Sequence, residues 1–126
     1  MKPLPLFDSH LHIIDRRFPL VENAGYLPPS FTVSDYRRRT ADWPLVGGAV
    51  VSGSFQAFDQ SYLLAALREL GDTFVGVTQL PPTVADDDVL ALASAGVRGM
   101  RFNLRRGGSA AAHDLGSMAA RLHELA

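Results

Sequence analysis

Apolar residues gather in four short runs along the chain, and between these runs they recur every three or four positions. The runs cover residues 6–14, 45–52, 74–80 and 97–104. Runs this apolar are typical of strands whose two faces are both covered, as in a parallel sheet. The pattern therefore predicts four strands of one parallel sheet.

The stretches between the runs are predicted to be helices. Leucines recur at helical spacing before Gly71, which suits a C-terminal cap, and Asp59 suits the N-cap of the same helix. Helices are expected over residues 60–70, 84–95 and 114–126, with a short additional helix starting near Thr32. Strands that alternate with helices indicate βαβ units. The expected fold class is therefore α/β with parallel βα repeats, in a single domain over residues 1–126.

Composition narrows the class of protein. Hydrophobic residues make up 47% of the 126 residues and charged residues 20%, which favours a packed core over disorder. The net charge of −1 argues against nucleic acid or an anionic membrane as the partner, because both require a surplus of Lys and Arg. We interpret the basic run at residues 37–39 as a solvated helix face.

Cysteine is absent, so the chain has neither a disulfide framework nor a thiolate metal site. No segment approaches the roughly 20 apolar residues that a membrane-spanning helix needs. The first apolar run is interrupted by Pro3 and Pro5, which is unlike a signal peptide. We therefore expect a cytoplasmic protein.

Three polar side chains are spaced two apart in the first predicted strand. Asp8, His10 and His12 would point to one face, because side chains alternate along a strand. Burying such groups without partners costs free energy, so a metal ion or a polar pocket is expected beside them. Two neutral imidazoles at this spacing can reach one cation. The alternative is a pair of hydrogen-bonded core histidines.

A second polar pair lies near the end of the fourth predicted strand. Arg101 and Asn103 are two apart, so they share a face, and the carboxyl ends of barrel strands hold the active site. An arginine there can grip a carboxylate through two parallel hydrogen bonds, unless it belongs to a structural ion pair. Arg105 and Arg106 follow directly, and either could add a second cationic contact.

The segment Phe7-Asp8-Ser9-His10-Leu11-His12 resembles the first-strand motif of the amidohydrolase superfamily. The resemblance is strongest to the branch that contains 2-pyrone-4,6-dicarboxylate lactonase and related lactone hydrolases. Residues 26–28, 52–55 and 96–103 resemble the same branch. This resemblance implies the N-terminal half of a TIM (β/α)₈ barrel, since a closed barrel needs about 250 residues. The chain also stops inside an amphipathic helix, as a half-barrel would.

The resemblance further implies a hydrolase that opens a lactone or ester bond of a carboxylate-bearing small molecule with an activated water. His10 and His12 would polarise the carbonyl and bind one divalent metal ion, Zn²⁺ by preference, which is dispensable in some members of the branch. Substrate would be bound by Tyr26, Ser54, Arg101 and Asn103. Ser54 is equally well explained as a turn residue, and Tyr26 as a packing residue.

The fourth strand departs from the pattern of two-metal amidohydrolases, because it lacks a bridging lysine or acidic residue. A two-metal centre is therefore not expected. A histidine and an aspartate from later strands would complete the site, so residues 1–126 alone are expected to be inactive.

Two alternatives remain open. A decarboxylase on the same scaffold is one, because a fold does not determine the reaction. A non-catalytic half-barrel that associates with itself is the other, because four βα units leave two open sheet edges and an exposed apolar face.

Overall fold

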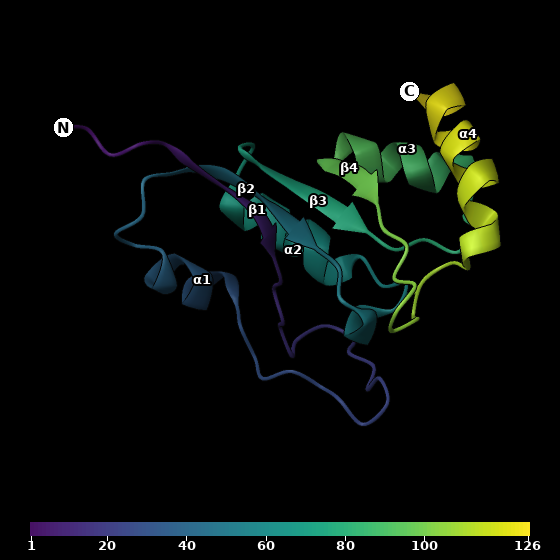
Figure 1. Cartoon of the computed structure of the whole chain (residues 1–126), viewed down its shortest axis with the longest axis horizontal. Coiled ribbons are helices and arrows are strands. Elements are labelled where there is room, and N and C mark those ends of the chain that lie inside the picture. The colour runs from purple at the N-terminus through teal and green to yellow at the C-terminus, as the bar shows by residue number, and fades with distance from the viewer.

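The computed structural model describes residues 1–126 and contains one sheet of four parallel strands. The strands lie side by side in the order of the sequence, β1-β2-β3-β4 (Figure 1). They are β1 (Leu6–Leu11), β2 (Leu45–Val51), β3 (Phe74–Thr78) and β4 (Val97–Met100). The α/β class and the parallel βα repeats expected from the sequence are confirmed.

A helix follows each strand. The helices are α1 (Val33–Arg39), α2 (Ser61–Leu70), α3 (Asp86–Ser94) and α4 (Leu115–Leu125), with short 3-10 turns η1 (Ser54–Gln56) and η2 (Ala112–Asp114). The short helix expected near Thr32 is α1, and it begins with a capping box. The Thr32 hydroxyl accepts from the Asp35 N–H, and the Asp35 carboxylate accepts from the Thr32 N–H.

The remaining helices start and end within two residues of the predicted bounds. Gly71 ends α2 as predicted, with a φ of +93° that favours glycine. Asp59 is not the N-cap, which is Gln60. The Asp59 carboxylate instead accepts from the N–H and the hydroxyl of Ser61, so it still satisfies a free donor at the start of α2.

The strands end earlier than their apolar runs. β1 stops at Leu11 rather than at residue 14, because Ile14 turns away and pairs antiparallel with Phe31 of the first loop. β4 stops at Met100, and only the N–H of Arg101 continues the ladder, through a bond to the neighbouring strand's last carbonyl. The last residues of both runs therefore belong to the loops beyond the sheet.

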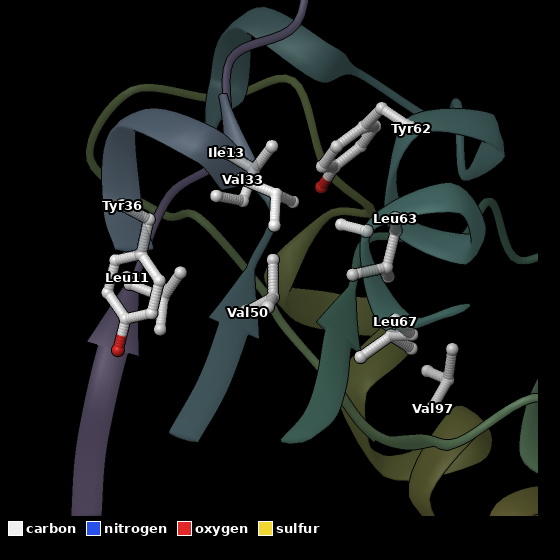
Figure 2. Packing of buried hydrophobic residues seen from close by; sticks show 10 residues of the cluster. Leu11, Ile13, Val33, Tyr36, Val50, Tyr62, Leu63, Leu67 and Val97 are labelled. Carbon is white, nitrogen blue, oxygen red and sulfur yellow. The ribbon is translucent and has the colours of Figure 1, made fainter. Parts of the chain in front are cut away.

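The main core lies between the sheet and helices α1 and α2 (Figure 2). Leu63 of α2 and Val50 of β2 are fully buried at its centre. A Cβ atom at Gly76 of β3 would lie 3.1 Å from Leu63 and 3.2 Å from Leu67, so glycine allows α2 to approach the sheet this closely. The cluster comprises Leu11, Ile13, Val33, Tyr36, Val50, Tyr62, Leu63, Ala66, Leu67 and Val97.

Both edges of the sheet are unpaired, because β1 and β4 each have one neighbouring strand. Near the start of β1 and β2, Phe7 is 50% exposed and Val46 is 53% exposed. The helices α3 and α4 lie together on the β4 side of the sheet (Figure 1). None of the helices has the length and hydropathy that crossing a membrane requires.

Strand β1 contains a bulge between Asp8 and Leu11. Asp8 pairs with Gly48 and Leu11 pairs with Val50, so three steps along β1 match two steps along β2. The extra residue places Asp8 on the same face as Leu11, which is buried against the helices. The bulge therefore separates Asp8 from the histidines that follow it.

Candidate active site

His10 and His12 point to the face of the sheet opposite the main core. They alternate with Leu11 and Ile13, which are both buried in that core. The two Nε2 atoms lie 3.4 Å apart, and the rings meet edge to face with centroids 4.9 Å apart. The prediction that the two imidazoles share a face agrees with this geometry.

The ring of His12 is fixed by the end of β2. Its Nδ1 lies 2.7 Å from the carbonyl oxygen of Val51, and because a carbonyl only accepts, Nδ1 carries the proton. Burial lowers the pKa of His12 below its ordinary value, the bond to Val51 opposes this, and the charges of His10 and Arg101 lower it further. In the neutral ring Nε2 therefore presents a lone pair toward His10.

The spacing of the two histidines fits one metal ion. Zinc binds imidazole nitrogen at about 2.0–2.1 Å in tetrahedral sites, which places two ligand nitrogens about 3.3–3.4 Å apart. A carbonyl bond from Nδ1 is also the usual support for a histidine that binds metal through Nε2. No group of three or more His, Cys, Asp or Glu side chains converges on one point. Residues 1–126 thus offer two ligands for such an ion.

Asp8 does not join the histidines, contrary to the expectation of a common face. Its carboxylate accepts from the Tyr36 hydroxyl of α1 at 3.1 Å and from the His10 N–H at 3.3 Å. The bulge in β1 is the physical reason, because it turns Asp8 toward the helices. Asp8 therefore holds the backbone of His10 from the face of the sheet that packs against the helices.

Arg101 reaches the same end of the sheet as His12. It follows β4 directly, and its Nη1 donates to the carbonyl of Ser52 at 2.6 Å. The neighbouring carbonyl, that of Val51, holds His12. The guanidinium has five N–H donors, so several remain for a ligand beside the imidazoles. The positive charge of Arg101 is close enough to lower the pKa of His12.

The three other residues expected to bind substrate lie in loops near this end. Ser54 begins η1 and is buried. The Oδ1 of Asn103 accepts from the Arg106 N–H, so this amide shapes its own loop. Tyr26 is 49% exposed, and the guanidinium of Arg106 lies over its ring, 5.5 Å from the centroid. We call this end of the sheet the mouth; it comprises residues 10–12, 53–57, 79, 101 and 103–108.

The sequence indicated Arg106 as a possible second cationic contact, and in the structure its guanidinium covers Tyr26 and its carbonyl accepts from the Asn23 amide. The sequence analysis missed Gln79, although it is a lone amide inside the apolar run 74–80. The argument applied to the histidines, that a polar group in a buried strand needs partners, would have identified Gln79.

The chain belongs to the amidohydrolase family, whose profile matches residues 7–125. A crystal structure from Agrobacterium tumefaciens superposes with a TM-score of 0.81 over 94% of the chain, at 24% identity. Together with the four parallel strands, this similarity shows that the chain has the fold of four βα units of a TIM barrel.

Two further relatives carry names. The 4-sulfomuconolactone hydrolase of Rhizobium radiobacter is 26% identical over 79% of the chain. A Pseudomonas putida structure, provisionally named a 2-pyrone-4,6-dicarboxylic acid hydrolase, is 30% identical over 78% of the chain, with a TM-score of 0.67. The chain spans 34% of the first protein and 36% of the second, and 44% of the Agrobacterium structure.

Proposed function

We propose that residues 1–126 supply one side of the active site of a hydrolase that opens a lactone or ester bond in a carboxylate-bearing small molecule. The observation that carries the proposal is the pair of imidazole Nε2 atoms, 3.4 Å apart, at the strand ends beside the charge of Arg101. The two named relatives support it, because both names describe hydrolases of anionic ring compounds.

The reaction divides between two groups of residues. Water adds to the lactone carbonyl carbon, the ring C–O bond breaks, and the ring oxygen leaves after taking a proton. His10 and His12 face the carbonyl, where developing negative charge needs a positive or hydrogen-bonding partner. Arg101 holds a carboxylate of the substrate with the donors that Ser52 does not use, which orients the ring over the imidazoles. We expect the base to come from outside residues 1–126.

His10 and His12 are also the residues that would bind a metal ion, Zn²⁺ by preference. Such an ion would polarise the carbonyl and lower the pKa of the attacking water. We expect one ion per chain, because strand β4 ends without a bridging ligand. Anomalous scattering from crystals grown with Zn²⁺ checks this, and two ions about 3.5–4 Å apart would contradict it. Activity after chelation tests whether the ion is dispensable.

The test of the reaction uses the assembled barrel, meaning these four βα units together with the strands that complete it. We expect 2-pyrone-4,6-dicarboxylate to disappear with acid release and without CO₂, whereas CO₂ release would favour a decarboxylase. His12→Ala should lower kcat/KM by about a hundredfold or more. His123→Ala is the matched control, because His123 lies exposed on α4. Equal losses in the two variants would exclude a catalytic role for His12.

A second candidate role is self-association through the open edges. Strands β1 and β4 each have an unpaired edge, and Phe7 and Val46 are exposed on β1 and β2. Light scattering of residues 1–126 would give a dimer mass if two copies complete one barrel. We expect this segment alone to be inactive in either case. A cytoplasmic location stays a prediction from the sequence.

A further inference from the structure

Gln79 lies where two loops of the mouth meet. It follows β3 directly and its side chain is fully buried. The amide nitrogen lies 2.9 Å from the carbonyl oxygen of Ala57, 2.9 Å from that of Gly108 and 3.3 Å from that of Gly53. One side chain thus joins the segment after β2 to the loop after β4. We call the bonds to Ala57 and Gly108 the Gln79 bridge.

The chemistry of the amide fixes its orientation. A flipped amide would place its oxygen against three carbonyl oxygens, which repel it, so the nitrogen must face them. The Oε1 of Gln79 is then buried with no hydrogen-bond partner. An unpartnered buried acceptor disfavours the folded state, and a methionine would fill similar space without one. The favourable contribution of this glutamine to the fold therefore comes from the hydrogen bonds of its amide nitrogen to the two loops.

Both ends of the Gln79 bridge have unusual backbone geometry. Ala57 has a φ of +46°, a region that favours glycine, and its carbonyl accepts from Gln79. Gly108 has a φ of +72°, and a Cβ atom there would lie 2.9 Å from the carbonyl oxygen of Ser54. The loop after β4 is therefore held directly against the segment that contains Ser54.

The loop held by the Gln79 bridge carries Arg106, a cationic side chain of the mouth in addition to Arg101. Arg106 lies over the ring of Tyr26, and the Asn23 amide donates to the Arg106 carbonyl at 3.0 Å. The first loop, the segment after β2 and the loop after β4 consequently meet around Gln79. Release of the bridge would change the distance between Arg106 and Arg101, which is anchored separately on Ser52.

We propose that Gln79 is a positioning residue that holds loop 103–108 against segment 53–57 and so fixes the width of the mouth. This inference rests on the proposed function for the identity of the ligand, a molecule with two or more carboxylates. The geometry of the bridge is independent of that function.

Hydrogen exchange in Gln79→Met tests the geometry. We expect the Ala57 and Gly107 amides, which are bonded inside the two segments, to exchange about tenfold faster than in the wild-type protein. Gln60→Met is the matched control, because the Gln60 amide bonds only to Thr78 and to the Gln79 backbone. Faster exchange spread equally over the sheet would mean that Gln79 only stabilises the fold, and would overturn the proposal.

Citrate binding to the assembled barrel tests the consequence, with citrate as a small polycarboxylate probe. We expect Gln79→Met to weaken citrate binding about tenfold and Gln60→Met to leave it within about twofold. Equal affinity in wild type and Gln79→Met would overturn the positioning role. Failure of the wild-type protein to bind citrate would count against the proposed substrate class, and hydrogen exchange would then decide the bridge alone.

A second variant keeps the test decisive if Gln79→Met does not fold. Gly108→Ala strains the same contact from the loop side, since its Cβ would meet the Ser54 carbonyl. We expect the same local acceleration at Gly107 and Ala57. Unchanged exchange at both amides in Gly108→Ala would overturn the proposal.

Discussion

The first two βα units and the last two are held in different ways. Ten buried side chains form the core between the sheet and helices α1 and α2, whereas the cluster near α4 contains only Leu80, Ala110 and Met118. Helix α3 has no buried residue at all. The histidines come from the well-packed region and Arg101 from the poorly packed one. The site therefore combines a part fixed by the core with a part fixed by loops.

Removing a large side chain from each region should give the largest difference between them. Leu63 is fully buried in the ten-residue core, so we expect Leu63→Ala to lower the free energy of unfolding by about 3–5 kcal/mol. Met118→Ala should cost about 2 kcal/mol, because the cluster of three buried residues around it is small and can close around the lost volume. Urea unfolding of both variants measures this. Equal losses would mean that the two regions are equally packed.

Loss of Arg101 should affect charged substrates more than uncharged ones. We expect Arg101→Ala to lower kcat/KM about ten- to a hundredfold for dicarboxylate lactones in the assembled barrel, because a charge-assisted bond is worth about 1.5–3 kcal/mol. Uncharged lactones should lose little. Arg98→Ala is the control, since Arg98 of β4 bonds to backbone carbonyls near α3. Equal losses for both substrate types would give Arg101 a purely structural role.

Tyr36 of the well-packed region should make the stability of the protein depend on pH in the alkaline range. Burial, and secondarily the charge and hydrogen bond of Asp8, raise the pKa of Tyr36 from 10.0 to about 12. Between these values the unfolded chain has lost a proton that the folded protein retains. Stability from this group is thus complete below about pH 10 and falls as the pH rises towards 12.

Urea midpoints at several pH values from 9 to 12 check this. Tyr36→Phe should flatten the fall and cost about 1 kcal/mol at neutral pH through the lost hydrogen bond. Burial also raises the pKa of Tyr62, so some dependence should remain in the variant. An unchanged slope would show that Tyr36 does not govern it.

The smallest effect should come from the ion pair that ties α4 to α3. Arg121 of α4 pairs with Asp86 of α3, which is 59% exposed. Exposed pairs contribute about 0.2–1 kcal/mol and are screened by salt. We expect Arg121→Ala to cost no more than this, and less in 1 M NaCl, by urea unfolding. A larger, salt-independent loss would mean that the backbone contact of Arg121 with Val84 anchors the helix.

The sequence predicted the four parallel strands and the helices from their hydrophobic patterns. It also predicted the shared face of His10 and His12, because alternation along a strand is a local property. It failed for Asp8, since a bulge depends on how two strands pair and leaves no mark in one strand alone. The strand ends were placed too late for a similar reason. Ile14 leaves the sheet because Phe31 of the first loop offers a partner.

The sequence predicted which residues lie at the mouth, but not the hydrogen bonds that hold them and their loops in place. Asn103 and Ser54 were expected at the mouth, and both lie there, but Asn103 uses its Oδ1 to hold its own loop. Whether either contacts substrate stays a prediction. Gln79 bonds to Ala57, 22 residues before it, and to Gly108, 29 residues after it. Contacts of that range arise only from the assembled fold.

Two consecutive carbonyls, that of the last residue of β2 and that of the residue after it, hold two of the groups proposed to act on the substrate. Val51 anchors the ring of His12, and Ser52 anchors the guanidinium of Arg101. Thermal motion of this strand end therefore displaces both groups in the same direction, and the vector between them varies less than the position of either. A substrate held at both points would travel with the strand end, so its alignment would tolerate fluctuations of the sheet as a whole.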